Sequence, residues 1–294
     1  DTTYTYTTEN WNGLDRYVVS FMTTTSSQEG HDLYGGSWHT TTPQVITNTY
    51  SWKDWNGQHV WGYDINGVDA MNGGYLRGVT SVVTGTDIFG NSTTTTTVTD
   101  YYIVKGKLVT MRAESTTVGT DVLGNSTTSV SVTEYKYNKI RRKGEEGTEW
   151  TPGEELAPGE MLVFNTIVTT TSSSGQDLYG GSWISDPYTI TKKYYWDPDR
   201  NAYVFLYFVG DMSKYTWDPV KKCYYIPAVI VILDDAQIIK RHRKDILGFD
   251  PFQGAQDALL QFKVTTTGSG SDLFGGKSHT TTVITFEVHR GQLV

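Results

Sequence analysis

Cysteine, proline and long apolar runs are scarce in this chain of 294 residues. The single cysteine, Cys223, excludes an intrachain disulfide and gives no pair of thiols for a structural zinc site. Apolar runs such as Val229–Leu233 are far shorter than the roughly 20 residues of a membrane-spanning helix, so we expect no membrane span. The richness in Thr, Ser and Gly favours an extracellular or cell-surface location, which scarce cysteine also fits.

Positive charge is also limited. The chain has 24 Lys and Arg against 32 Asp and Glu, which gives a net charge of −8 and an isoelectric point near 5.2. Binding to nucleic acid requires a basic surface that neutralises phosphates. The one strong basic cluster, Lys240–Lys244, is local and typical of a solvated strand or turn, so we expect no nucleic-acid partner.

Recognisable catalytic and metal-binding motifs are missing as well. The six histidines, at positions 31, 39, 59, 242, 279 and 289, lack the spacing of a metal site. There is no phosphate-binding loop and no nucleophile elbow. We therefore expect no catalytic residue, no metal ligand and no cofactor, and we expect that the protein is not an enzyme.

Strand-forming residue types are abundant. Thr, Tyr, Val, Ile and Trp fit a pleated surface, and aromatic residues make up 13% of the chain. Stretches such as Val130–Thr133 alternate apolar and polar residues with the period of a strand. The best helical candidate is short, Ala255–Phe262. The sequence predicts an all-β fold of repeated long β-hairpins that form two related β-sandwich-like domains.

A five-residue phrase occurs five times: Asp, an aliphatic residue, a bulky apolar residue, Gly, and then Gly or Asn. The copies begin at Asp32, Asp87, Asp121, Asp177 and Asp272, and their glycines are Gly35, Gly90, Gly124, Gly180 and Gly275. Asp caps a turn through its side chain, and Gly or Asn accepts a positive φ. We expect every copy to be a tight turn at the tip of a hairpin.

The end of the chain repeats an earlier part. Residues 87–109 and 272–294 align without a gap, and ten of the 23 paired positions are identical. The segment Asp1–Thr8 likewise alternates Thr and Tyr from its first residues. We expect the terminal segments to be strands that are completed by a neighbouring chain or by further covalent sequence. The residues expected on these assembly strands are Thr2, Tyr4, Tyr6, Val283, Phe286 and Val288.

A second near-duplicate predicts two domains, because Val168–Trp183 closely matches Ser20–Trp38. The segment 141–160 between the two halves is charged and contains Pro152, Gly153, Pro158 and Gly159, which break regular structure. We expect a first hairpin-repeat domain at residues 1–140, a Pro/Gly/Glu-rich linker at 141–160, and a second hairpin-repeat domain at 161–294.

Three aromatic phrases predict further hairpins. Tyr195–Pro198 and Tyr215–Pro219 both end in Trp-Asp-Pro, and Tyr50–Asp54 is a degenerate form. Asp-Pro after a strand starts a turn, since Pro has a restricted φ and cannot donate to a ladder. These hairpins are expected to carry aromatic cross-strand pairs. The segment Val60–Gly74, rich in Gly, Asn and Asp, is expected to be an elaborated loop.

The sequence contains candidate sites for covalent glycans. Asn91 and Asn125 each begin an Asn-Ser-Thr sequon inside a turn phrase, and the Thr runs are candidate O-glycan acceptors. The alternative is that Thr simply suits the solvated face of a strand. The candidate acceptors are Asn91, Asn125, Thr40, Thr41, Thr42, Thr95, Thr96, Thr97, Thr280, Thr281 and Thr282.

In general style, the chain resembles repetitive, Thr-rich surface or fibre proteins of microbes. The phrases at Asp87 and Asp121 also resemble the Asp-x-x-Gly-Asn phrase of YD repeats, although Thr86 and Thr120 stand where those repeats have Tyr. The resemblance to fibre proteins implies a structural subunit or repeating segment of an extracellular filament or giant cell-surface protein, which assembles head-to-tail with copies of itself. The nine Trp residues leave two alternatives open: a secreted carbohydrate-binding or adhesive module, and a glycan-active enzyme.

Overall fold

The computed structural model describes residues 1–145, 147–197, 201–209, 216–218, 223–225, 236–239, 260–271, 277–289 and 292–293. Within these ranges the chain forms antiparallel strands, turns and irregular segments and contains no helix, so the predicted all-β fold is confirmed. The chain divides into two compact units, Asp1–Val122 and Leu123–Val294.

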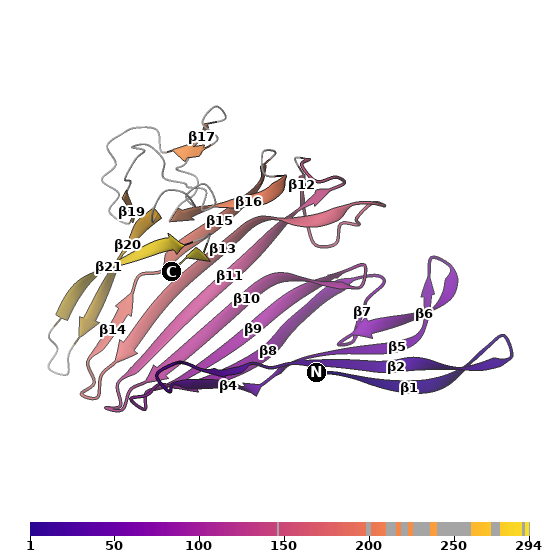
Figure 1. The fold of residues 1–294 in the computed structure, drawn as a ribbon, viewed down its shortest axis with the longest axis horizontal. Coiled ribbons are helices and arrows are strands. Elements are labelled where there is room, and N and C mark those ends of the chain that lie inside the picture. The colour runs from indigo at the N-terminus through magenta and orange to yellow at the C-terminus, as the bar shows by residue number, and fades with distance from the viewer. Residues whose placement is uncertain are drawn as a thin grey trace. The chain divides into compact units, whose positions relative to one another are not determined.

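The first unit contains two groups of antiparallel strands (Figure 1). One has the order β1-β2-β5-β6-β7 and the other the order β10-β9-β8-β4-β3. The bounds are β1 (Thr2–Trp11), β2 (Leu14–Ser26), β3 (Glu29–His31), β4 (Ser37–Thr42), β5 (Gln44–Trp55), β6 (Gln58–Ile65), β7 (Val68–Asp69), β8 (Gly74–Thr86), β9 (Ser92–Val104) and β10 (Lys107–Thr120). Most neighbours in a sheet are consecutive in the chain, because short hairpins join them.

Two-residue turns connect four of these hairpins. The turn pairs Asn12-Gly13, Asn56-Gly57, Asn66-Gly67 and Lys105-Gly106 all have positive φ at both residues. This conformation belongs to the type I′ turn, whose twist matches that of the flanking strands. The strand register follows directly, since the residues on either side of each turn pair with one another.

The two sheets of the first unit meet at a small apolar core. Its buried members are Ile65, Ala70, Leu76, Val79 and Ile103. They come from the end of β6, the turn after β7 and the facing parts of β8 and β9 (Figure 1). Much of the remaining strand surface in this unit is only half-buried, so these few side chains form the dry centre of the packing.

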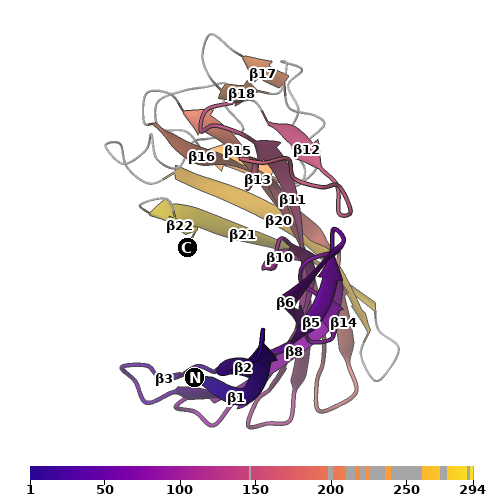
Figure 2. The ribbon, with the colours of Figure 1, turned by 90° about the vertical axis from the view of Figure 1, so that its right-hand side faces the viewer.

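The second unit is built around two long strands. β11 (Ser126–Ile140) pairs with β13 (Met161–Gln176) along its whole length, with one irregularity in register. The other strands are β12 (Thr148–Trp150), β14 (Ser182–Ser185), β15 (Tyr188–Asp197), β16 (Ala202–Val209), β17 (Thr216–Asp218), β18 (Cys223–Tyr225), β19 (Ala236–Ile239), β20 (Leu260–Ser271), β21 (Lys277–His289) and β22 (Gln292–Leu293). β15 and β16 extend the sheet beside the middle of β13, whereas β14 pairs with its end and leads to β20 and β21 (Figure 2).

The two units repeat one local arrangement. The Thr40 hydroxyl donates to the Gln28 carbonyl at 3.0 Å and accepts the Gln28 N–H at 2.8 Å. In the second unit, the Ser185 hydroxyl makes the same two bonds with Ser173, at 3.1 and 3.0 Å. The next hairpin then pairs in the same way, since β4 pairs with β8 in the first unit and β14 pairs with β20 in the second. The repeated sequence phrases therefore build equivalent hairpins.

Some sequence expectations differ from the structure. Val60–Gly74 is not an elaborated loop, because most of it forms β6, β7 and the start of β8, and its Asn66-Gly67 pair makes a tight turn. Residues 260–262 of the helical candidate begin β20, whereas residues 255–259 lie outside the described ranges. The expected linker, 141–160, contains β12 and connects the sheet neighbours β11 and β13, and the division between compact units falls upstream of it.

We expect Ile103→Ala to destabilise the first unit by about 2–5 kcal/mol, since the side chain is completely buried in the small core and its loss leaves a cavity. Chemical denaturation followed by tryptophan fluorescence measures this loss. The matched control is Ile88→Ala at a turn tip, where the side chain is 50% exposed and we expect a change of no more than about 0.5 kcal/mol. Equal losses for the two variants would contradict the assigned core.

Candidate functional site

The repeated phrase forms a five-residue turn. In the copy at Asp87, the Asp87 N–H donates to the Asn91 carbonyl at 3.0 Å and the Gly90 N–H donates to the Asp87 carbonyl at 3.1 Å. The carboxylate Oδ1 of Asp87 accepts the N–H groups of Phe89 and Asn91 at 2.8 and 2.9 Å. The copies at Asp32 and Asp177 make the same four bonds. The Asp side chain thus satisfies backbone donors that the turn would otherwise expose.

Glycine is required by the backbone of this turn. Gly35, Gly90, Gly124 and Gly180 have φ values of 100°, 87°, 90° and 88°. Glycine adopts this region readily because it has no Cβ. The fifth copy, Asp272 with Gly275, lies outside the described ranges, but Ser271 and Lys277 on either side of it pair as the flanking residues of the other copies do.

The hydrogen bonds around Asp87 favour its charged form. Burial raises the pKa of this carboxyl, but the bonds from the side-chain amide and backbone of Asn91, and from the backbone of Phe89 and Gly90, outweigh that effect. The pKa of Asp87 therefore lies below its ordinary value of 3.8. The carboxylate is a structural cap that remains charged at neutral pH.

The turns expose large apolar side chains. Leu33 is 98% exposed, and the other turn residues of this kind are also exposed: Tyr34, Ile88, Phe89, Val122, Leu123, Leu178 and Tyr179. Asparagine links neighbouring turns. The Asn91 Oδ1 accepts the Val122 N–H at 3.1 Å in the first unit, and the Asn125 Oδ1 accepts the Leu178 N–H at 3.0 Å in the second. The last residue of the phrase therefore decides whether a turn can reach its neighbour, since Gly36 and Gly181 have no side chain.

The candidate glycan acceptors have different environments. Asn91 is half-buried, and its Nδ2, the atom that an N-glycan would modify, donates to Asp87 at 2.7 Å. Asn125 is also half-buried. Thr41, Thr42 and Thr281 are exposed, whereas the Thr40, Thr95, Thr96 and Thr97 side chains are half-buried, and Thr280 and Thr282 lie in β21.

Many Thr and Ser hydroxyls form cross-strand ladders. Thr95 and Thr117 lie 2.9 Å apart through their hydroxyl oxygens, and Thr97 and Ser115 lie 3.0 Å apart. Other such pairs are Ser131 with Thr171, Thr133 with Thr169, and Thr170 with Thr189. These ladders give the Thr runs a structural role on half-buried sheet faces. From the sequence, the Thr runs are expected to be either glycan acceptors or residues on the solvated face of a strand.

The expected assembly strands lie at sheet edges. β1, which carries Thr2, Tyr4 and Tyr6, pairs with β2, and the described ranges contain no strand on its other side (Figure 1). β21, which carries Val283, Phe286 and Val288, pairs with β20 along its whole length. On the other side of β21, β22 pairs only with Val288 and His289 among the described residues. Within the described ranges, each strand therefore has one side along which most of its residues pair with no other strand.

Two tryptophans occupy equivalent places beside glycine. Trp38 pairs with Gly30 on one side and Gly85 on the other. Trp183 likewise lies between Gly175 and Gly270. Sequence reasoning identified both tryptophans as part of the repeat but missed the glycine partners. The signal was available, since Gly30 and Gly175 precede their tryptophans by the same number of residues.

Several other aromatic residues contact one another across neighbouring strands, as the sequence predicts for the aromatic hairpins. Trp52 pairs directly with Trp61 in β5 and β6, with ring centroids 5.4 Å apart, and Trp11 lies 5.1 Å from Trp52. Trp196 pairs with Tyr203 in β15 and β16 at 5.0 Å. These half-buried rings meet in tilted or edge-to-face arrangements, and such aromatic contacts stabilise the strand pairs.

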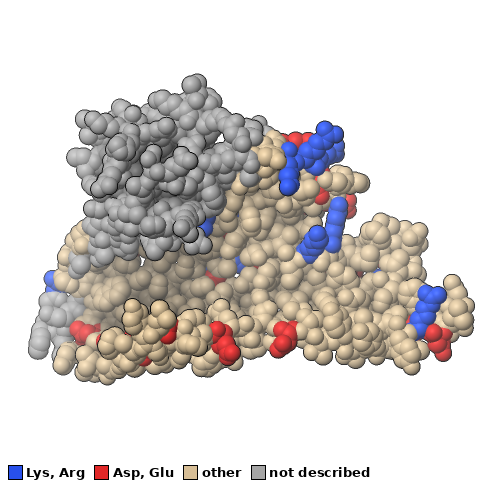
Figure 3. All heavy atoms as spheres, in the orientation of Figure 1, with Lys and Arg blue, Asp and Glu red and all other residues tan. Residues whose placement is uncertain are grey.

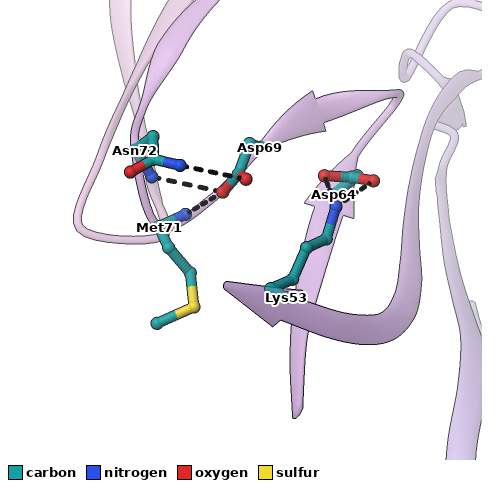
Figure 4. A network of polar contacts seen from close by, with 5 residues as sticks. All are labelled: Lys53, Asp64, Asp69, Met71 and Asn72. Carbon is teal, nitrogen blue, oxygen red and sulfur yellow. Dashed lines mark hydrogen bonds and ion pairs between the residues drawn. The ribbon is translucent and has the colours of Figure 1, made fainter. Parts of the chain in front are cut away.

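A polar network lies near the core of the first unit (Figure 4). Lys53 Nζ contacts both carboxylate oxygens of Asp64 at 2.7 Å. Asp69 accepts the N–H groups of Met71 and Asn72 at 2.8 and 3.2 Å, and its pKa is lowered because these bonds and the Lys53 charge outweigh burial. The arrangement caps the turn between β7 and β8 and neutralises a half-buried lysine, which are structural roles.

Charge and metal-ligand chemistry add no further site within the described ranges. On the face shown in Figure 3, the Lys and Arg side chains are separated by uncharged surface rather than gathered in one broad patch. No group of three His, Cys, Asp or Glu side chains suited to a metal ion occurs in the described part of the chain. The same part contains no helix long and apolar enough to cross a membrane.

Comparisons with known proteins give no relatives. No protein-family model matches the chain, and no curated protein or solved structure is significantly similar to it. The strand edges and the exposed side chains are therefore the features of this chain that bear on its function.

We expect the Asp87 cap to make stability depend on acidic pH. A carboxyl with a lowered pKa in the folded state stabilises the fold above its unfolded pKa, and this contribution is lost as pH falls through the folded pKa. The ordinary value is 3.8, so the loss occurs below about pH 4. Thermal unfolding between about pH 6 and pH 3 should show a smaller acid-induced decrease in melting temperature for Asp87→Asn than for the natural chain.

The comparison isolates Asp87 because Asp69 and Glu154, whose pKa values are also lowered, are unchanged in both proteins. Parallel pH profiles for the two proteins would show that the Asp87 charge does not stabilise the turn.

Proposed function

We propose that the chain is a structural subunit or repeating segment of an extracellular filament or giant cell-surface protein, and that copies pair head-to-tail through β1 and β21. The observation that carries the proposal is the pair of long strand edges without a described partner. Strand addition forms main-chain hydrogen bonds along an entire edge, so it can join subunits without a large apolar interface.

The internal repeat supports an added strand beside β21. In the repeat, β21 corresponds to β9, and β9 is covered by β10 from Val104 to Ser92. β22 corresponds to the first two residues of β10, since His289 pairs with Gln292 as Val104 pairs with Lys107. Within the described ranges, no strand other than β22 pairs with this side of β21. A strand from a second copy that lay along this side would pair with β21 as β10 pairs with β9 in the first unit.

The first unit offers one long edge for that role. The sheet that ends in β1 has β7 at its other border, and β7 contains only two residues. Proteins that avoid edge pairing use short edge strands, charges, proline or bulges. β1 is ten residues long, and Thr2–Thr8 contains no charged residue and no proline. The irregularity in this hairpin places the extra residue, Ser20, on β2 and leaves β1 regular.

Pairing between two different edges produces open assembly. A contact between β1 of one copy and β21 of the next is heterologous, so it repeats without closing unless the rotation forms a ring. The proposal therefore predicts filaments or long oligomers rather than a dimer. An extracellular location and covalent glycans on exposed Thr42 or Thr281 are compatible parts of the proposal, and no catalytic activity is needed for it.

We expect the double substitution Tyr4→Lys with Tyr6→Lys to weaken assembly. Both tyrosines lie on β1 and are more than half exposed, so lysine can be accommodated there while its charge opposes edge pairing. In sedimentation velocity over a concentration series, the concentration at which half of the variant is assembled should be at least about tenfold higher than for the natural chain. A tenfold change corresponds to a loss of about 1.4 kcal/mol in the free energy of association. Electron microscopy of the same samples would show whether filaments are present.

The matched control is Phe21→Lys, because Phe21 is 46% exposed and pairs with β1 on one side and β5 on the other, so it does not lie at a sheet edge. This variant should assemble like the natural chain. A natural chain that remains monomeric at every concentration, or a β1 variant that assembles normally, would contradict the proposal.

A further inference from the structure

We propose that Trp38 and Trp183 are two equivalent carbohydrate-binding platforms, which stack on the flat faces of equatorially linked pyranose rings in an extended polysaccharide. This inference goes beyond assembly and does not depend on it. It rests on ring geometry, exposure and the repetition of the same surroundings in the two units.

Each indole lies face-on over a glycine. Cε2 and Cη2 of Trp38 lie 2.7 and 2.9 Å from the position that a Cβ on Gly30 would occupy, and Cζ2 between them is closer still. Such similar distances to three consecutive ring atoms place the face of the ring, rather than its edge, over the glycine. For Trp183, Nε1 lies nearest to the corresponding position on Gly175, and Cε2 and Cζ2 follow at 2.5 and 2.8 Å, so a neighbouring part of the same ring face covers this glycine. No other residue type could lie beneath these rings without moving them.

A large part of each indole remains exposed to solvent. Trp38 is 41% exposed and Trp183 is 43% exposed, although glycine covers one face of each ring. By contrast, Trp150 is buried and donates its indole N–H to the Glu154 carbonyl at 3.0 Å. Each of the two exposed indoles therefore presents apolar ring surface to solvent, and an aromatic face of this kind is a surface on which a sugar ring can stack.

Small and hydroxylated residues flank the platforms in the same order. Beside Trp38, Gly85 pairs with Thr93, and beside Trp183, Gly270 pairs with Ser278. Thr93 and Ser278 are both exposed. The glycines keep the surface beside each indole low, and the hydroxyls can donate to or accept from sugar hydroxyls. An apolar surface with a few polar groups is the usual composition of a ligand site, and a flat one suits a polymer.

Covering a glycine in a neighbouring strand is itself a structural role for an aromatic side chain. Leucine is also apolar and can cover a glycine, but it has no flat ring face. This difference separates the two roles. Trp38→Leu and Trp183→Leu should retain the cover over Gly30 and Gly175 but lose the flat outer face on which a pyranose stacks.

Isothermal titration with cellohexaose and with chitohexaose tests the proposal on the whole chain. We expect the natural chain to bind at least one of them at two equivalent sites, each single leucine variant to retain one site, and the double variant to bind at least about tenfold more weakly. Tyr34→Leu with Tyr179→Leu is the matched control, since these exposed tyrosines lie on the turns of the same hairpins. Binding by the control should be unchanged.

A second measurement needs no variant. N-bromosuccinimide oxidises exposed indoles, and peptide mass spectrometry locates the oxidised residues. Either hexasaccharide that binds should protect Trp38 and Trp183 from oxidation, which keeps the proposal testable if the leucine variants fail to fold. The proposal is overturned if the natural chain binds neither sugar, or if a folded double variant binds as tightly as the natural chain. It is also overturned if both tryptophans are oxidised at an unchanged rate in saturating sugar.

Discussion

The rest of this structure depends on its tight turns, because the type and length of the turn determine the pairing register of the two strands in a hairpin. A slip of one residue between paired strands moves every side chain to the opposite face of the sheet. Strands of 13 to 16 residues, such as β8, β9 and β13, multiply the consequences of a slip. The Asp-capped turns and the Asn-Gly turns prevent it by accepting one backbone path only. The glycine with positive φ and the carboxylate that holds the backbone N–H groups are therefore the residues on which the long ladders depend.

With register determined, the sheets can be stabilised without a large apolar core. The core of the first unit has five buried members, whereas Thr and Ser hydroxyls meet across strands in both units. Each cross-strand pair contributes only about 0.2–1 kcal/mol, but such pairs recur along several long strand pairs, including β9 with β10 and β11 with β13. Thr serves this purpose well, since its branched Cβ favours the strand while its hydroxyl finds a partner across the ladder. The same chemistry explains why the Thr runs are as regular as the turns that flank them.

The repeat also places the candidate sites. Equivalent hairpins in the two units carry Trp38 and Trp183 between glycines. Among the described residues, β9 is paired along both sides, whereas one side of β21 is paired only at Val288 and His289. Assembly and glycan binding would use different features of the same sheets. The first would use the backbone at the borders, and the second would use indole faces away from them. A filament with binding platforms on its subunits would display many weak sites together, and multivalency raises the overall avidity of such an array.

The sequence by itself determined the all-β class, the positions of the turns and the aromatic hairpin pairs, because these depend on residues that are close together in the chain. Gly35 or Asn56 must adopt positive φ whatever the distant chain does. Local patterns failed at Val60–Gly74, where Gly and Asn suggested a loop but pairing between β5 and β6 made strands. They also could not show that Gly85 lies beside Trp38, or which strands become edges, since these facts depend on partners far away in the sequence. Only the tertiary structure decided them, through hydrogen bonding between distant strands.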